Sequence, residues 1–149
     1  MESIPQELNW VAAHTSCTVA RVFRELFEGA KRDVEAINLA YKLRSDSCFI
    51  VDPGNADKFM IRRGESIEQV VTFWRSEGAI YVKDEAAKDK FTVKVTVSAS
   101  GRCKLKVGRA EHAGQPEKFG PELEQWQVRK MALESLFFGL SWVHEDPAG

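Results

Sequence analysis

The amino-acid sequence predicts an α+β domain, because helical spacing in the first third of the chain gives way to a period of two further along. Apolar residues recur at helical intervals from Val19 to Ala30, which is typical of a helix with one buried face. Between residues 90 and 97 apolar and polar residues alternate, as in a strand that buries one side. With 149 residues the chain fits one domain, 1–149. We expect residues 1–15 to be an N-terminal extension and 141–149 a frayed tail.

The first part of the chain is predicted to hold three helical pieces and a hairpin. A short helix ends near Ala13, and Thr15 and Ser16 are candidate caps of a second helix. Gly29 and the charged residues 31–33 predict a break before a third helical piece. The hairpin then consists of a strand at 48–52, a turn at 53–57 and a strand at 58–62.

The second part is predicted to begin with a helix and to continue with strands. Residues 66–69 fit a capping box, and the helix that follows carries Ile67, Val70, Val71 and Trp74 on its apolar side up to Gly78. Strands follow at 79–83, 90–97 and 103–109, with a turn at 98–101 and an exposed loop at 112–121. The segment 122–131 is open between two alternatives: propensity slightly favours a helix, whereas the alternation of Trp126 and Val128 fits a strand.

Composition indicates an ordinary globular protein in the cytoplasm. Hydrophobic residues make up 44%, charged residues 29%, and the formal net charge is -1, a balance that does not suggest nucleic acid. We find neither a membrane-spanning run nor a signal sequence. Cys17, Cys48 and Cys103 are an odd set without a CxxC pair, which predicts buried reduced thiols rather than a disulfide framework. The histidines lack metal-ligand spacing, so we expect no metal and no cofactor.

Several short phrases follow one another in an order that a known superfamily shares. They are RDVEAI (32–37), SDSCFIVDPG (45–54), RGESI (63–67), FWR (73–75) and EQWQVRKM (124–131). Together they resemble the nuclear-transport-factor-2-like superfamily, and in particular its ketosteroid isomerases and polyketide cyclases. The resemblance implies a cone in which N-terminal helices pack on a strongly curved mixed β-sheet, an apolar pocket inside it, a homodimer, and a final long strand at 124–131.

Asp52 lies where ketosteroid isomerases have the aspartate that moves a proton between carbons. The tyrosine and the second acid of their oxyanion hole have no counterpart here, since Phe23 or Glu25 replaces the tyrosine and Arg109 replaces the acid. Arg109 facing Asp52 would favour the ionised carboxylate, or would bind a carboxylate or an enolate. The alternative is a purely structural ion pair between the two side chains.

The resemblance makes Asp52 and Arg109 the candidate catalytic residues and Phe23, Phe27, Trp74 and Met131 the candidate lining of a pocket. The expected ligand is a small apolar or weakly acidic organic molecule. The expected function is binding of that molecule, or a proton transfer of the isomerase, cyclase or dehydratase type. Packing in an ordinary core is the alternative for the four apolar residues.

A basic hairpin at 88–109 supports a different class of function. Its cations face only Asp89 as an acid; they are Lys88, Lys90, Lys94, Arg102, Lys104, Lys106 and Arg109. Lys94, Lys104 and Lys106 should share one face of the sheet, which could contact phosphates or an acidic partner in a non-catalytic interaction domain. The row has no interleaved aromatic residue, which argues against nucleic acid. A solvated face, or one covered by acids of a dimer partner, is the alternative.

Overall fold

The computed structural model describes residues 7–43, 47–109 and 114–139. Its elements are α1 (Trp10–Ser16), α2 (Val19–Ala40), β1 (Phe49–Asn55), β2 (Lys58–Arg63), β3 (Val70–Arg75), β4 (Ile80–Asp84), β5 (Asp89–Val97), β6 (Cys103–Arg109), β7 (Lys118–Leu123) and α3 (Gln125–Phe138).

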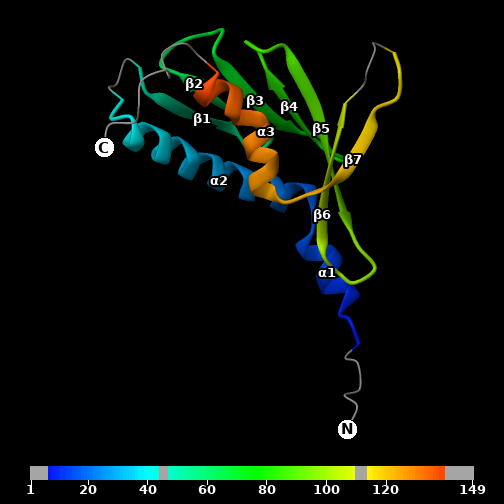
Figure 1. Ribbon diagram of the computed structural model, residues 1–149. Coiled ribbons are helices and arrows are strands. Elements are labelled where there is room, and N and C mark those ends of the chain that lie inside the picture. Colours follow the sequence, from blue (N-terminus) through cyan, green and yellow to red (C-terminus); the bar gives the residue numbers. More distant parts are fainter. Residues whose placement is uncertain (1–6, 44–46, 110–113, 140–149) are drawn as a thin grey trace.

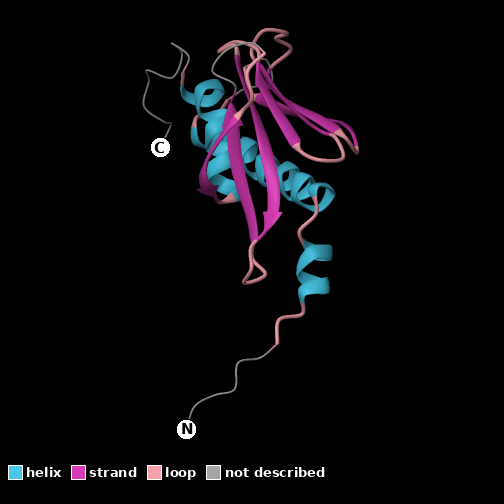
Figure 2. Ribbon diagram, turned by 90° about the vertical axis from the view of Figure 1, so that its right-hand side faces the viewer, coloured by secondary structure: helices cyan, strands magenta, loops and turns pink. Residues whose placement is uncertain are grey.

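The seven strands form one antiparallel sheet in which each strand pairs with the next along the chain. Figures 1 and 2 show α2 and α3 over one face of this sheet, whereas the other face carries none of the described helices. The predicted α+β class is therefore confirmed. Every described strand pair is antiparallel, and short connections join successive strands. The mixed sheet that the resemblance implied is therefore wrong.

The core lies between the two long helices and one face of the sheet, which we call the covered face. Phe59 and Phe73 stack there with ring centroids 4.5 Å apart, and Phe23 of α2 lies 5.2 Å from Phe59. Phe49 of β1 meets Phe137 of α3 at 4.8 Å. Each of these rings is buried, so the aromatic residues join both helices to the sheet.

Helix α2 is continuous, and the break predicted at Gly29 and residues 31–33 is wrong. The Oγ1 atom of Thr18 accepts a hydrogen bond from the Arg21 N–H, which begins the helix. A Cβ atom at Gly29 would clash with the guanidinium group of Arg129. The glycine therefore makes room for a side chain of α3 and does not end the helix. No described helix is both long and apolar enough to span a membrane.

The β1–β2 hairpin confirms the two strands predicted around residues 53–57. Strand β1 extends further than expected, through Pro53 and Gly54 to Asn55. Gly54 has a φ of 54°, a conformation that favours glycine, and the pairing of β1 with β2 shifts register between Asp52 and Asn55.

The helix predicted to begin at residues 66–69 is wrong, since Val70–Arg75 form strand β3. The Ser66 Oγ atom accepts hydrogen bonds from the N–H groups of Glu68 and Gln69, but within a turn. The valine-rich and aromatic composition of Val70–Arg75 favours a strand, and pairing with both β2 and β4 completes it. Gly78 consequently lies in the connection between β3 and β4, and not at the end of a helix.

The strand predicted at 124–131 from the resemblance is wrong as well, because Gln125–Phe138 form helix α3. The Glu124 N–H donates to Oε1 of Gln127 at 2.8 Å, which closes a capping box. Residues at helical spacing are buried against the core; they are Val128, Ala132, Leu133, Leu136 and Phe137. Of the loop predicted at 112–121, residues 118–121 belong to β7 and 112–113 lie outside the described residues. The predicted tail at 141–149 lies outside them too.

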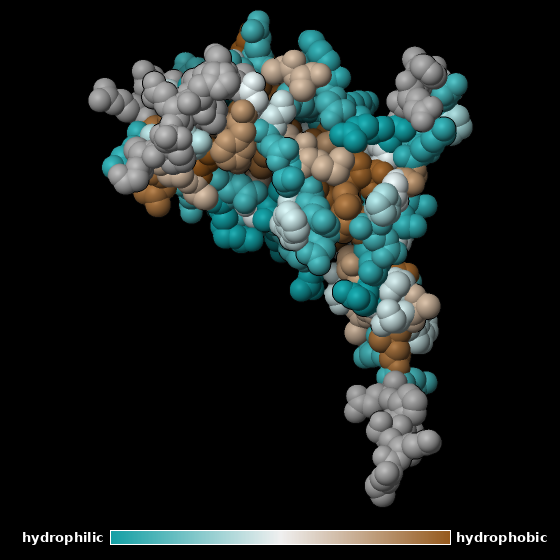
Figure 3. Space-filling view, viewed as in Figure 1, coloured by the Kyte–Doolittle hydropathy of each residue, from teal (hydrophilic) through white to brown (hydrophobic). Residues whose placement is uncertain are grey.

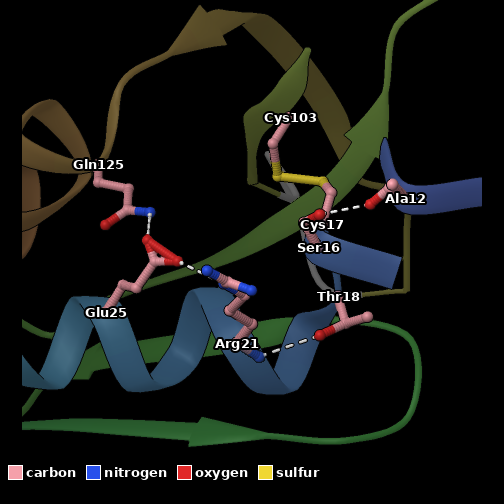
Figure 4. Close-up of polar contacts among 8 residues, drawn as sticks. All are labelled: Ala12, Ser16, Cys17, Thr18, Arg21, Glu25, Cys103 and Gln125. Atoms are coloured by element: carbon pink, nitrogen blue, oxygen red, sulfur yellow. Dashed lines mark hydrogen bonds and ion pairs between the residues drawn. A yellow bond between two sulfur atoms is a disulfide. The ribbon is translucent and has the colours of Figure 1, made fainter. Parts of the chain in front are cut away.

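A disulfide joins Cys17 to Cys103 (Figure 4), so the prediction of reduced thiols is wrong for these two residues. It connects the end of α1 to the start of β6 across 86 positions of sequence, with the Cα atoms 5.4 Å apart. Beside it, Glu25 of α2 accepts from the Gln125 side chain at 3.0 Å and pairs with Arg21. The disulfide thus ties the end of α1 to β6, and the hydrogen bond from Gln125 to Glu25 connects the beginning of α3 to α2.

Candidate functional site

The predicted catalytic residues Asp52 and Arg109 do not come together, because β1 is the first strand of the sheet and β6 the sixth. Arg109 binds Asp89 through two hydrogen bonds of 3.1 and 2.8 Å. Asp52 lies 3.7 Å from Nη2 of Arg62 and accepts from the Gly54 N–H at 3.1 Å. The predicted Asp52–Arg109 pair is therefore wrong, and each side chain has a structural partner on its own hairpin.

The four predicted pocket residues do not line one cavity either. Phe23 and Phe27 border a cavity of about 330 Å³ beside Phe59 on the covered face. Trp74 lies on the opposite face of the sheet, where it stacks with Tyr81. Met131 packs against the core from α3. The division follows from the alternation of side chains along β3, which turns Phe73 and Trp74 to opposite faces.

The face that carries none of the described helices, which we call the open face, has a row of side chains running across the sheet. Strand pairing aligns the members of this central row, which are Lys58, Trp74, Tyr81, Thr92, Gly108 and Phe119. The rings of Trp74 and Tyr81 are 5.5 Å apart and nearly parallel. Three aromatic residues from three different strands thus lie on one line.

Two lysine pairs flank the central row. Lys83 pairs directly with Lys90 on one side of it, and Lys94 pairs with Lys106 on the other. Like charges placed directly opposite each other across two strands destabilise a sheet. The predicted shared face of Lys94, Lys104 and Lys106 is confirmed by this register.

The charge on this face is only partly neutralised within the chain. Lys83 pairs with Glu85 at 3.3 Å and Lys104 with Glu122 at 2.9 Å. Among the described residues, Lys90, Lys94 and Lys106 form no ion pair. The hydrogen bond from Lys104, followed by the charges of the neighbouring cations, lowers the pKa of Glu122. An acid on this surface therefore titrates in a positive field.

Phe119 occupies the end of the central row on β7. A Cβ atom at Gly108 would lie 2.8 Å from Cδ1, 2.8 Å from Cε1 and 3.0 Å from Cζ of this ring. The Nζ atom of Lys94 is 5.8 Å from the ring centroid. Beside Phe119, Glu117 accepts a hydrogen bond of 2.6 Å from the buried hydroxyl of Thr92, which holds the beginning of β7 against the sheet.

A second surface feature is an apolar groove between α2 and α3. It has a volume of about 540 Å³ and is lined among others by Ala36, Ile37, Leu133 and Phe137. Figure 3, which views the molecule from the side that carries α2 and α3, shows apolar side chains interspersed with polar ones there. The Arg129–Asp33 ion pair of 2.8 Å lies at its edge.

The basic hairpin at 88–109 signalled the lysines of the open face in the sequence, but nothing signalled its aromatic residues. Tyr81, Lys83 and Phe119 were not predicted as site residues, and Trp74 was predicted on a helix and in a pocket. Their alignment depends on the pairing of β2 to β7, which no single segment encodes. The comparisons give no further guide, because no protein-family model, curated protein or solved structure matches this chain.

Proposed function

We propose that this protein is a non-catalytic interaction domain whose open face binds an extended polyanion. The observation that carries the proposal is that two pairs of lysines stand directly opposite each other in the strand register, one on either side of the central row. An anionic chain laid across the strands would neutralise charges that repel each other in the free protein. A second copy of the same face is a poor partner, since it would bring lysines against lysines.

Inorganic polyphosphate is a suitable first probe, because it supplies charge without bases or sugars. We expect the double variant Lys94→Gln, Lys106→Gln to bind it roughly 25-fold more weakly at about 0.1 M salt, if each lysine neutralises one phosphate of a flexible chain. The slope of log K against log salt should fall by about 1.4. Titration by calorimetry or by competition with a labelled polyanion measures both quantities.

A matched control is the double variant Lys31→Gln, Lys130→Gln, which removes the same charge from the helices. It should retain the affinity and the salt dependence of the wild type. Absence of polyphosphate binding at low salt, or equal losses in the two double variants, would contradict the proposal.

A second candidate is binding of a small apolar molecule, the function expected from the resemblance, in the groove between α2 and α3. Its volume of about 540 Å³ is within the range of ligand pockets, and its lining is largely apolar. A thermal-shift screen of polycyclic ketones and organic acids tests it. Ala36→Trp, which fills the groove, should abolish any shift, whereas Asp52→Asn should leave it unchanged.

Several expectations from the sequence stay predictions. They are the nuclear-transport-factor-2-like relationship with its cone, a homodimer, and a cytoplasmic location. The Cys17–Cys103 disulfide counts against the last of these, because disulfides persist mainly in oxidising compartments. Labelling of thiols in intact cells, before and after reduction, would decide the point.

A further inference from the structure

The ring of Phe119 lies with its flat side on the sheet. Three successive ring carbons are at nearly equal distances, 2.8, 2.8 and 3.0 Å, from the position of a Cβ atom at Gly108. If the ring met Gly108 by its edge, the third carbon would be much further away than the first two. The missing side chain of Gly108 therefore lets the ring face rest on the backbone of β6.

The opposite side of this ring is partly exposed, and the Nζ atom of Lys94 lies 5.8 Å from the ring centroid. Phe119 is 41% exposed, although it is a large apolar side chain in a strand. An exposed flat aromatic ring is the platform on which proteins stack the bases of single-stranded nucleic acids. Trp74 and Tyr81 differ from it, because their rings stack on each other and are turned face to face.

Cations lie one step along the strands from this platform. Lys94 follows Thr92 by two residues and Lys106 precedes Gly108 by two, so both point to the open face in the row next to Phe119. Adjacent rows on one face are about 6.8 Å apart. A phosphate held by these lysines would thus leave its own base within reach of the Phe119 ring.

The same geometry separates nucleic acid from other polyanions. A chain of phosphates or sulfates gains no binding free energy from an apolar ring. A nucleic-acid base does, because it can stack on the exposed face of the ring. The row of Lys94, Lys104 and Lys106 contains no aromatic residue of its own, which in the sequence argues against nucleic acid. In the folded sheet the aromatic residues come from other strands and lie between the two lysine pairs.

Resting on the proposed polyanion-binding function, we infer that the polyanion is single-stranded nucleic acid, with one base stacked on Phe119 and phosphates bound by Lys94 and Lys106. Bases are read here by their flat faces, so the affinity depends little on sequence.

The test compares oligothymidylate with an abasic deoxyribose-phosphate oligomer of equal length, which has the same phosphates and no bases. Wild-type protein should bind oligothymidylate about 5- to 150-fold more tightly. Phe119→Leu should remove this difference by weakening oligothymidylate binding alone. Gly108→Ala should act in the same direction although Phe119 is present, because the added methyl group lifts the ring.

Phe138→Leu is the matched control, since Phe138 is a 53% exposed phenylalanine on α3. It should leave both affinities unchanged, and thermal unfolding of each variant verifies that it is folded. Equal binding of the two oligomers by wild type would overturn the inference and leave polyanion binding intact. If polyphosphate and both oligomers fail to bind, the proposed function and this inference fall together.

Discussion

The two faces of the sheet are built from alternate residues of the same strands, and they differ in what their side chains do. On the covered face Phe59, Ile61, Val71 and Phe73 are almost completely buried under α2 and α3. On the open face their neighbours Met60, Thr72 and Trp74 are partly exposed. Burial and exposure thus fall on alternate positions, so under the proposed function a change on the covered face should lower stability and spare binding, and a change on the open face should do the reverse.

The faces also differ in how well their charges are satisfied. The covered face is nearly free of charge in its centre, as a core requires. The open face retains two lysine pairs in direct opposition, which a sheet selected only for stability would lack. A surface that carries avoidable repulsion is a candidate for binding the opposite charge.

The largest expected effect tests the covered face. Phe73→Ala removes a ring that is fully buried and stacked on Phe59, and should lower the free energy of unfolding by about 3–5 kcal/mol. Thr72→Ala, one residue away on the open face, should change it by less than about 0.5 kcal/mol. Urea unfolding monitored by circular dichroism measures both. Similar losses in the two variants would mean that the faces are not divided in this way.

The next effect concerns α1, which buries none of its own residues and is attached to β6 by the disulfide. Reduction should lower the free energy of unfolding by about 2–4 kcal/mol, because the bond closes a long loop in the unfolded chain. The double variant Cys17→Ser, Cys103→Ser should show the lower stability with and without reductant. If the melting temperature of the wild type were the same with and without reductant, the disulfide would have no role in stability.

Local patterns were sufficient for some elements and not for others, and the reason lies in how far apart the interacting residues are. The alternation at 90–97 and 103–109 predicted β5 and β6, because these strands pair across a short turn. In β3, Val70, Val71 and Trp74 satisfy both a helical and a strand reading, and only pairing with β2 and β4 decides between them.

Local patterns did not predict the disulfide or the row of aromatic residues, because the residues involved lie on segments that are distant in sequence. Cys17 and Cys103 are 86 positions apart, and nothing beside either residue indicates the bond. Phe119 joins Trp74 and Tyr81 in one row only through the registers of successive strand pairs. For residues 124–131, the slight helix propensity predicted the observed helix, whereas the resemblance to the superfamily predicted a strand that does not form.

A smaller effect is expected from a change on the open face that raises the stability of the fold and lowers the affinity for polyphosphate. Lys94→Glu replaces one lysine of a like-charge pair by an acid opposite Lys106. The free energy of unfolding should rise by about 0.2–1 kcal/mol, while polyphosphate affinity falls. Lys94→Gln should give an intermediate value for both quantities. A lower free energy of unfolding in Lys94→Glu would show that repulsion between the two lysines does not destabilise the fold.

The smallest effect is a titration on the open face. Lys104 and the neighbouring cations lower the pKa of Glu122 from its usual value of 4.5. Since the pKa is lower in the folded than in the unfolded chain, the ionised carboxylate stabilises the fold above pH 4.5, and this contribution is lost as the pH falls through the folded pKa. Lys104→Gln should raise the pKa of Glu122 towards 4.5 in an NMR titration, whereas Lys130→Gln on α3 should not. Polyphosphate bound to the open face should raise the pKa of Glu122 as well, because the anion offsets the positive field of the lysines. If the pKa of Glu122 does not change when polyphosphate binds, the anion binds elsewhere.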